Sequence, residues 1–438
     1  MAEFSRIPIS ELVASGEAEL KTGPFGTQLK ASEYTERGTP VINVRNIGFG
    51  SIKVDRVEFI SPTTRERLSS HLLRRGDIVF GRKGAVERHV FIRQEQDGWF
   101  QGSDCLRLRF VSRRVEPLFA SYYFLTTDHQ RWMMNQCSHG ATMASLNQGI
   151  LERIELPLPP LPVQKRIAGI LSAYDELIEN SQRRIKILES MACALYREWF
   201  VHFRFPGHEN HPRVASALGE IPQGWKVKKL GDIITVHIGG GWGKEAPDDK
   251  HSEPALVIRG TDIPMVRYAQ MTGVPYRVHS TSNLRSRRLT AGDIVFEVSG
   301  GSKGQPVGRT LLITSELLAS VAGDVICASF CKRIQPDLQG YGSELLYLSF
   351  IEGYESGEIE QYQVQSTGIS NFKWTEYIAH TDRVIPPAEL REQFRGHVVP
   401  LFSQVATLGR KIHNLRLTRD LLLPRLLSGQ IEARLPEP

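Results

Sequence analysis

Residues 159–167 read Pro-Pro-Leu-Pro-Val-Gln-Lys-Arg-Ile, and they introduce a long apolar pattern that the chain repeats 227 residues further on. The second copy follows another Pro-Pro pair, at 386–387, and begins its apolar pattern at Phe394, the counterpart of Ile167. A duplication of this size at a fixed spacing predicts two structurally related halves. We therefore expect a molecule with internal pseudo-two-fold symmetry.

The apolar pattern follows a heptad repeat in both copies. From Ile167 to Trp199, steps of four and three residues reach large apolar side chains at eight of ten positions, and the second copy keeps the same register from Phe394 to Leu426. A 3.5-residue spacing is typical of helices that pack along a partner helix. We expect the two long helices to pair with each other as an antiparallel coiled coil, with ends about 60 Å apart for roughly 40 residues. The alternative is two ordinary amphipathic helices on separate domains.

The second helix contains two residues that oppose helix formation. Gly396 and Pro400 lie inside its apolar pattern, and an interior proline removes a backbone hydrogen bond and kinks a helix. Proline is favoured in the first turn instead. The sequence therefore predicts that this helix begins properly at Pro400.

The segments before the two helices also repeat, more loosely. Residues 40–47 are echoed by residues 255–263. Arg75–Phe80 is echoed by Ala291–Phe296, and each of these two segments has Gly-Asp before an apolar run. Such short runs entered through Gly-Asp turns indicate β-strands. A third match relates residues 138–142 to 365–370. The fold class is therefore α+β: two β-rich domains with flanking helices, each followed by one long helix.

These repeats divide the chain into four parts. We expect a first β-rich domain at 1–158, a helical spacer at 159–204, a second β-rich domain at 205–385 that starts with a linker at 205–217, and a second helical spacer at 386–438. The length of 438 residues suffices for two sizeable cores. No apolar run is long enough to span a membrane and the first residues do not form a signal peptide, so we expect a cytoplasmic protein.

The cysteines and the net charge indicate the redox compartment and the kind of binding partner. Five cysteines without a CxxC pair favour buried thiols in a reducing compartment, with neither disulfides nor a zinc site. The net charge of +6 makes a polyanionic partner plausible. Basic residues stand close to the glycine-rich loops, as in Arg82-Lys83. Such loops suit phosphate and base-edge contacts, although an exposed turn would have the same composition.

Catalytic motifs are missing from the sequence. Gly240–Glu245 lacks the spacing and the hydroxyl residue of a phosphate-binding loop, and neither Pro-Pro pair lies in an Asn/Asp-Pro-Pro-aromatic loop of an amino-methyltransferase. Pro247–Lys250 crowds its carboxylates too closely for a nuclease. His208 and His211 lie in the predicted linker and His202 shortly before it, and we expect no metal at these three residues. The chain is therefore expected to recognise a ligand rather than to catalyse a reaction.

Several motifs together resemble one family, the specificity (S) subunits of type I restriction-modification systems. They cover nearly the whole chain and are the following: residues 23–30 (GPFGTQLK), 159–167 (PPLPVQKRI), 195–200 (LYREWF), 218–230 (LGEIPQGWKVKKL) and 422–429 (LLPRLLSG). The resemblance implies that the two β-rich segments are target recognition domains that each read half of a bipartite DNA sequence. It also implies that the paired helices act as a ruler for the unread gap.

The resemblance implies partners as well. Two methyltransferase subunits, which bind S-adenosylmethionine, would dock on the helices, and motor-nuclease subunits would join that complex. This chain would carry no cofactor and no catalytic residue. Three alternatives are a self-sufficient enzyme, a coiled-coil scaffold without a DNA role, and an orphan bipartite DNA-binding protein without a methylation partner. The orphan protein is the strongest alternative, because it would keep the recognition fold.

Candidate DNA-binding residues follow from the repeated polar loops. Arg45 and Arg259 match each other across the copies, which favours a shared role such as a phosphate contact or an internal ion pair. The other candidates lie in the loops that the family presents to DNA, and they are Arg82, Lys83, His139 and Thr142 in the first domain and Ser299, Ser302, Lys303, Ser366 and Thr367 in the second.

Overall fold

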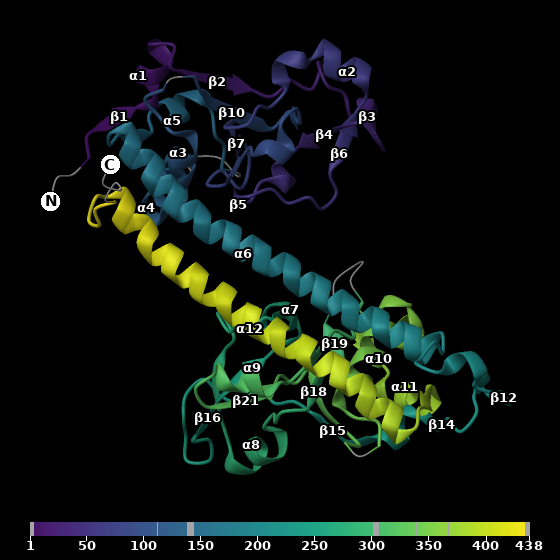
Figure 1. Ribbon diagram of the computed structural model, residues 1–438. Coiled ribbons are helices and arrows are strands. Elements are labelled where there is room, and N and C mark those ends of the chain that lie inside the picture. Colours follow the sequence, from purple (N-terminus) through teal and green to yellow (C-terminus); the bar gives the residue numbers. More distant parts are fainter. Residues whose placement is uncertain are drawn as a thin grey trace, which may run out of the picture. The chain divides into compact units, whose positions relative to one another are not determined.

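A computed structural model describes residues 4–111, 113–137, 144–300, 306–338, 340–366 and 368–433. The chain divides into two compact units. Unit 1 comprises Met1–Glu176 and Arg416–Pro438, and unit 2 comprises Leu177–Leu415. Each long helix therefore contributes one part to each unit (Figure 1).

Unit 1 is built on a five-stranded sheet and a four-stranded sheet. The strand order of the larger sheet is β2 (Ala18–Thr22), β10 (Cys105–Phe110), β7 (Ile78–Gly81), β8 (His89–Phe91) and β5 (Phe49–Gly50). That of the smaller sheet is β3 (Tyr34–Thr35), β6 (Glu58–Ile60), β4 (Thr39–Ile42) and β9 (Phe100–Gln101). A separate pair joins β1 (Arg6–Pro8) to β11 (Glu155–Pro157), close to the start of the long helix.

Short helices cover the sheets of unit 1. They are α1 (Ile9–Ala14), α2 (Pro62–Arg67), α3 (Pro117–Phe124), α4 (Thr127–Cys137) and α5 (Gln148–Glu152). The main core of this unit gathers aliphatic and aromatic residues of β7 and β10 with those of α1, α3, α4 and α5.

Unit 2 repeats this plan with additions. Its central sheet has the order β15 (Ile234–Gly239), β22 (Cys331–Pro336), β18 (Ile294–Glu297) and β20 (Thr310–Leu312), and a three-stranded sheet has β17 (Tyr276–His279), β16 (Glu253–Ile258) and β21 (Asp324–Cys327). Three further sheets join β19 (Ser299–Gly300), β24 (Ile369–Phe372) and β23 (Gln363–Ser366), β14 (Lys226–Lys229) to β25 (Asp382–Ile385), and β12 (Arg213–Ser216) to β13 (Gly219–Pro222). Its short helices are α7 (Ile263–Val266), α8 (Thr281–Arg287), α9 (Ser315–Ala319), α10 (Ser343–Glu355) and α11 (Trp374–His380).

The Gly-Asp turns enter the central strands as predicted. Gly76 and Gly292 both have a positive φ, of 91° and 92°, which glycine adopts without steric cost. The next residue caps the turn in each unit, since Asp77 accepts from the amide of Arg74 at 2.8 Å and Asp293 from that of Thr290 at 2.7 Å. The same local chemistry thus starts β7 and β18.

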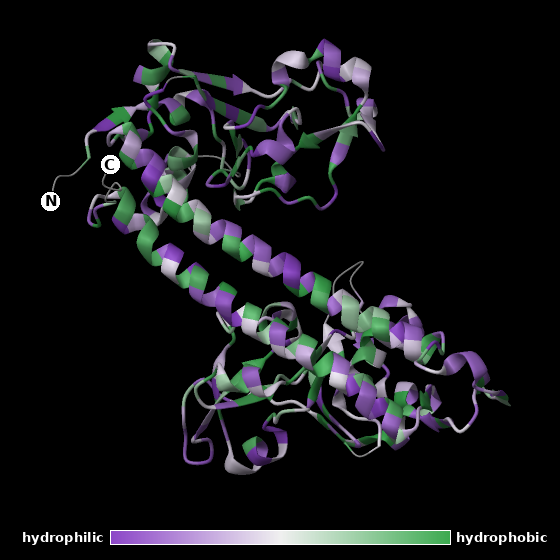
Figure 2. Cartoon of the chain, in the orientation of Figure 1, coloured by the Kyte–Doolittle hydropathy of each residue, from purple (hydrophilic) through white to green (hydrophobic). Residues whose placement is uncertain are grey.

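The two long helices are α6 (Leu161–Tyr196), which continues into a π-helical turn at Arg197–Val201, and α12 (Ala388–Leu427). Within unit 1, Ile167 and Leu171 of α6 pack with Leu426 and Leu427 of α12. Because the start of α6 meets the end of α12, the pairing is antiparallel, as predicted. Figure 2 shows hydrophobic and hydrophilic residues alternating along both helices.

Within unit 2 the helices pair in the same sense. Ile178 and Ile185 of α6 pack with Leu408 and Ile412 of α12. Further along, Phe394 contacts the ring of Phe200, with centroids 4.7 Å apart. The predicted heptad positions therefore form the buried seam in both units.

The prediction that the second helix begins at Pro400 is wrong, because α12 begins at Ala388 and runs through both Gly396 and Pro400. Phe394 and Val398 are fully buried in the core of unit 2, so packing holds this turn in the helix. Pro400 and Gly396 are exposed on the opposite side, where water can bond the Gly396 carbonyl that the proline leaves without an amide.

Candidate nucleic-acid interface

Three loops of unit 1 leave the same edge of the central sheet. The end of β2, the start of β10 and the end of β7 are adjacent, because the Gly23 amide donates to Cys105 O at 2.9 Å and the Arg82 amide to Asp104 O at 2.8 Å. The loops are residues 23–28, 102–104 and 82–84. We call this loop set the strand-end edge of unit 1.

The segment that follows the third sequence match, from Ala144 to Leu146, lies along this edge; residues 138–142 themselves fall outside the described residues. The Gly84 amide donates to Ala144 O at 3.0 Å, and the Leu146 amide donates to Arg82 O at 2.8 Å. Two polar segments that are about 60 residues apart in the sequence therefore run side by side.

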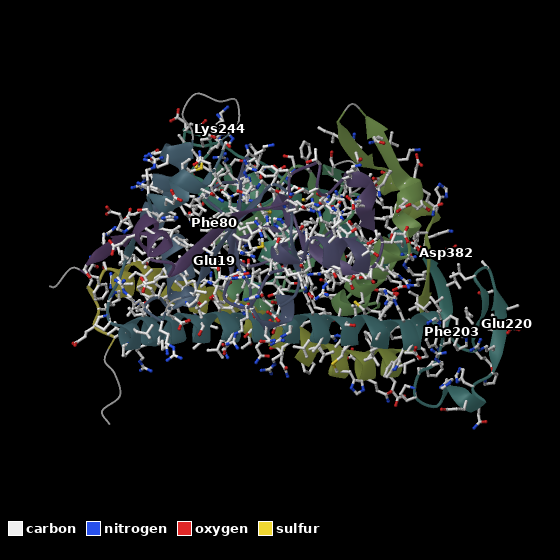
Figure 3. All side chains as sticks on the ribbon, turned by 90° about the horizontal axis from the view of Figure 1, so that it is seen from above. Glu19, Phe80, Phe203, Glu220, Lys244 and Asp382 are labelled. Carbon is white, nitrogen blue, oxygen red and sulfur yellow. The ribbon has the colours of Figure 1, made fainter. Side chains whose placement is uncertain are left out.

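Unit 2 has the same edge. The Gly240 amide donates to Cys331 O at 2.9 Å, and the Val298 amide donates to Phe330 O at 2.9 Å. Here the third match, residues 365–370, ends in strand β24, which pairs with β19 through Gly300 and Ser370 and through Ser299 and Asn371. The strand-end edge of unit 2 is therefore formed by residues 240–244, 328–330 and 298–300, with β24 beside them. Lys244 lies on the side of unit 2 turned away from the helices (Figure 3).

Close backbone packing fixes glycine at both edges. A Cβ atom at Gly23 would lie 1.9 Å from Gly102 O, and one at Gly240 would lie 2.2 Å from Ala328 O. Real Cβ atoms do not approach oxygen this closely, so the two loops cross the neighbouring turn only because these residues are glycine.

Three of the predicted residues lie on these edges. Arg82 is half-buried, whereas Lys83 is exposed and forms an ion pair with Asp104 at 3.4 Å. Ser299 donates through its hydroxyl to Asn371 Oδ1 at 2.7 Å. Arg82 and Lys83 thus share one edge and Ser299 the other, as side chains that DNA could reach.

Arg45 and Arg259 lie outside these loops. Arg45 forms an ion pair with Glu58, and Arg259 holds Asp262 through two hydrogen bonds of 2.8 and 2.7 Å. These carboxylates raise the pKa of each arginine, by a hydrogen bond in both cases. Both guanidinium groups are therefore engaged within their own unit.

The expected equivalence of Arg45 and Arg259 is wrong by two residues. Ile42 O accepts from Gly102 and Ile258 O from Ala328, so Ile42 and Ile258 are the equivalent strand ends. Asn43, which follows Ile42, is therefore the counterpart of Arg259. Both precede a short 3₁₀ turn, Val44–Asn46 in unit 1 and Gly260–Asp262 in unit 2, which the loose sequence repeat did not align.

Of the remaining predicted residues, five fall outside the described residues and one is described only by its strand. His139, Thr142, Ser302, Lys303 and Thr367 fall outside the described residues, and Ser366 is described only as the last residue of β23.

The strand-end edges also contain side chains that the sequence did not single out as contacts. Phe25 is 64% exposed in unit 1, while Trp242 and Phe330 are 40% and 56% exposed in unit 2. Arg277 lies over the Trp242 ring at 4.8 Å, and Arg287 donates to Gly239 O at 2.9 Å. The sequence carried a signal for Phe25 and Trp242, because each stands between glycine or proline residues that predict a loop, but it carried none for Phe330.

The cysteines beneath the edges are not nucleophiles. Burial raises the pKa of Cys105 to about 12 and also raises that of Cys331. Both thiols stay protonated at neutral pH, and a protonated thiol is a poor nucleophile.

Among the described residues, no group of three or more His, Cys, Asp or Glu side chains could hold a metal ion. His208 and His211 instead bond the carbonyls of Phe205 and Gln223, each at 2.8 Å. No helix within the described ranges is both long and apolar enough to cross a membrane.

Comparison with known proteins agrees with this arrangement. Residues 24–190 match the type I restriction modification DNA specificity domain. The MjaIX specificity subunit of Methanocaldococcus jannaschii is 27% identical over 317 residues, which cover 71% of this chain and 68% of that protein. The HindI specificity subunit of Haemophilus influenzae is 21% identical over 418 residues, covering 82% and 87%.

The fold is also that of a solved specificity subunit. The S subunit from M. genitalium superimposes with a TM-score of 0.57 at 14% identity, covering 97% of this chain and 96% of that one. The duplicated β-rich units, the paired helices and these matches agree: the chain belongs to the specificity subunits of type I restriction-modification systems, the non-catalytic subunits that recognise the DNA target within such complexes.

Proposed function

We propose that each unit reads one half of a bipartite DNA sequence through its strand-end edge. The observation that carries the proposal is that the same three loops leave the same sheet edge in both units, held by equivalent backbone hydrogen bonds. Cationic side chains lie at or beside each edge, as DNA phosphates require, and so do exposed side chains of other chemistry that could select bases. The proposed reading surfaces include Arg82 and Lys83 in unit 1 and Ser299 in unit 2.

The paired helices act in this proposal as the ruler between the half-sites. Both helices have 36 or more residues in one continuous element, and their buried seam is apolar in both units. A continuous packed helix pair resists bending better than a loop linker does. The proposed target recognition domains are residues 1–158 and 205–385, and the helical spacers are 159–204 and 386–438.

The helices also dock two methyltransferase subunits, which supply S-adenosylmethionine and the methyl transfer to adenine, while motor-nuclease subunits join the same cytoplasmic complex. Exposed apolar side chains on the helices support a docking role. Ile187 and Met191 are 58% and 52% exposed on α6, and Leu417 and Leu421 are 52% and 63% exposed on α12. Each pair is spaced by four residues and so forms a small apolar patch on one helix face.

A co-expression experiment tests the function. The chain is produced with the methyltransferase subunit encoded beside it, and methylated adenines are mapped across the host DNA by single-molecule sequencing. We expect a two-part motif with an unread gap that disappears when this chain is omitted. A folded, co-purifying chain that yields no motif would contradict the proposal.

A DNA-binding assay with and without the methyltransferase subunit separates the orphan protein from the proposed function. An orphan DNA-binding protein would bind a bipartite duplex equally well with and without the methyltransferase subunit and would not co-purify with it. A subunit of the complex should co-purify and should require its partner for methylation at the motif.

A further inference from the structure

One turn occupies the same place on both strand-end edges but carries different chemistry. Gly102-Ser103-Asp104 precedes β10 in unit 1, and Ala328-Ser329-Phe330 precedes β22 in unit 2. The first residue of each turn donates its amide to a strand end, Gly102 to Ile42 O at 2.9 Å and Ala328 to Ile258 O at 2.8 Å. Asp104 and Phe330 are therefore structural counterparts.

The backbone of the third residue is held by hydrogen bonds, and its side chain is exposed. Asp104 O accepts from the Arg82 amide, and Phe330 O accepts from the amides of Val298 and Ser299 at 2.9 and 3.2 Å. The side chains extend outward instead, since that of Asp104 is 51% exposed and Phe330 is 56% exposed. A position with a fixed backbone and an exposed side chain can change chemistry without changing the fold.

The exposed phenyl group of Phe330 has no role in the core of unit 2. It does not belong to any of the hydrophobic clusters found among the described residues, although three other phenylalanines of unit 2, Phe296, Phe350 and Phe372, all do. An exposed aromatic ring is unfavourable in water and gains free energy when a partner covers it. Its neighbours on the edge are Ser299 and the loop of residues 240–244, which are proposed to face DNA.

We propose that this turn residue selects a base in each unit, Phe330 by contact with a thymine methyl group and Asp104 by accepting a hydrogen bond from the exocyclic amine of cytosine or adenine. The inference rests on the proposed function and specifies it. Phenylalanine has no hydrogen-bonding group, and the thymine C5-methyl is the apolar feature of the major groove. A carboxylate can only accept, and cytosine N4 and adenine N6 are the donors in that groove.

Lys83 makes the acidic position compatible with DNA. A carboxylate near phosphates is repelled, and the ammonium group of Lys83, 3.4 Å from Asp104, offsets that repulsion. Phe330 is uncharged and does not require such a partner.

The first test replaces Phe330 by alanine in the complex with the methyltransferase subunit, followed by mapping of methylated adenines. We expect one thymine-specific position in one half of the motif to accept other bases, while the other half stays unchanged. Leu338→Ala is the matched control, because Leu338 is 67% exposed beyond the opposite end of β22. The control should leave the motif intact.

The outcomes separate the inference from the proposed function. No motif with the unaltered chain would reject the proposed function itself. A normal motif that Phe330→Ala leaves unchanged would overturn only the inference. Uniform loss of methylation at every position, with the variant folded and co-purifying, would also overturn it, because Phe330 would then serve general DNA or subunit binding.

A second test removes only the methyl group from the DNA. Duplexes carrying uracil in place of each thymine of the motif are compared in binding to the unaltered complex and to the Phe330→Ala complex. We expect uracil at one position to weaken binding of the unaltered complex about fourfold, the value for losing one buried methyl-sized group, and to leave the variant unaffected. Equal weakening of both complexes would contradict a contact between Phe330 and the methyl group.

Asp104→Ala tests the other unit in the same assays. We expect it to relax one cytosine or adenine position in the half of the motif that Phe330→Ala leaves intact, and to reduce binding to the original sequence about tenfold. Val111→Ala, 56% exposed beyond the opposite end of β10, is its control. Relaxation of the same half by both variants would overturn the assignment of one turn to each half-site.

Discussion

Unit 1 and unit 2 place side chains of opposite character at one equivalent position of their long helices. In unit 1, Tyr122 of α3 donates to Asp175 of α6 at 2.6 Å, and Arg419 of α12 bonds the other oxygen of that carboxylate at 2.5 Å. In unit 2 the helical counterpart of Asp175 is Phe402, whose ring contacts that of Tyr347 of α10, with centroids 5.7 Å apart. At this position a tyrosine faces the helix pair in both units, but it meets a carboxylate in unit 1 and an aromatic ring in unit 2.

This difference shows which features the duplication retains. The seam of apolar residues is maintained, whereas the contact between each β-rich domain and the helices has been rebuilt. The start of α6 makes further polar contacts with unit 1. The buried Gln164 side chain forms hydrogen bonds of 2.8–2.9 Å with the main chain of Arg114, Glu116 and Pro159. The helices therefore share one architecture, and each unit attaches to it through its own side chains.

The largest expected effect comes from the aromatic contact of unit 2. Phe394 is fully buried against Trp199 and Phe200, with ring centroids 5.6 and 4.7 Å away. Phe394→Ala should lower the free energy of unfolding by about 3–5 kcal/mol, because it leaves a cavity in a packed cluster. Its counterpart in unit 1, Ile167→Ala, removes fewer atoms and should cost about 2–4 kcal/mol. Denaturant unfolding of both variants checks the order, and a larger loss at Ile167 would contradict it.

The strand-end edges predict a difference in DNA reading. If Arg82 makes a bidentate base contact, Arg82→Ala should cost about 1–3 kcal/mol of DNA binding and relax a single position of the unit 1 half-site. Lys83→Ala, which removes the charge beside Asp104, serves as the comparison in the same loop. Selection on random DNA distinguishes the two kinds of contact. Uniform weakening by Arg82→Ala on all sequences would mean a phosphate contact instead.

Acid should affect unit 1 first. Burial lowers the pKa of His89 and of His129 to about 3, so both are neutral in the folded protein. A histidine with a depressed folded pKa contributes stability above its unfolded pKa of about 6.5 and loses it as the pH falls. One such group should cost about 2 kcal/mol at pH 5, since each pH unit below 6.5 contributes roughly 1.4 kcal/mol.

Hydrogen exchange read by mass spectrometry can follow the two units separately as the pH is lowered. We expect loss of protection in unit 1 before unit 2, and His129→Phe should shift the unit 1 transition to lower pH. His129 packs on the ring of Phe124, with centroids 4.9 Å apart, so phenylalanine suits the site. An unchanged transition in the variant would show that His129 does not drive the acid response.

The sequence predicted the long helices and the starts of the central strands. It did not predict which loops meet at the strand-end edges. Heptad spacing and Gly-Asp turns are local signals, and both helices and the starts of β7 and β18 follow them. The strand-end edges depend on pairing between β2, β10 and β7, which are far apart in the sequence, so Asp104 and Phe330 carried no local signal. Pro400 shows the opposite error: the local signal for a helix start was real, but burial of Phe394 and Val398 outweighed it.

The smallest effects distinguish the two glycines of α12 and show where unit 2 rests on this helix. A Cβ atom at Gly409 would lie 2.5 Å from Tyr268 O, whereas one at Gly396 meets nothing within 4 Å. Gly409→Ala should therefore destabilise unit 2 by about 1–2 kcal/mol through overpacking, while Gly396→Ala should stabilise it by about 0.5–1 kcal/mol through helix propensity. Opposite shifts in Tm would confirm this. Stabilisation by both substitutions would mean that the backbone at Tyr268 moves away to accommodate the added methyl group. The counterpart of Gly409 in α6 is the exposed Gln182, so this close approach belongs to α12. The helical repeat, strict in its apolar seam, is thus interrupted at the position where the backbone of unit 2 lies against the helix.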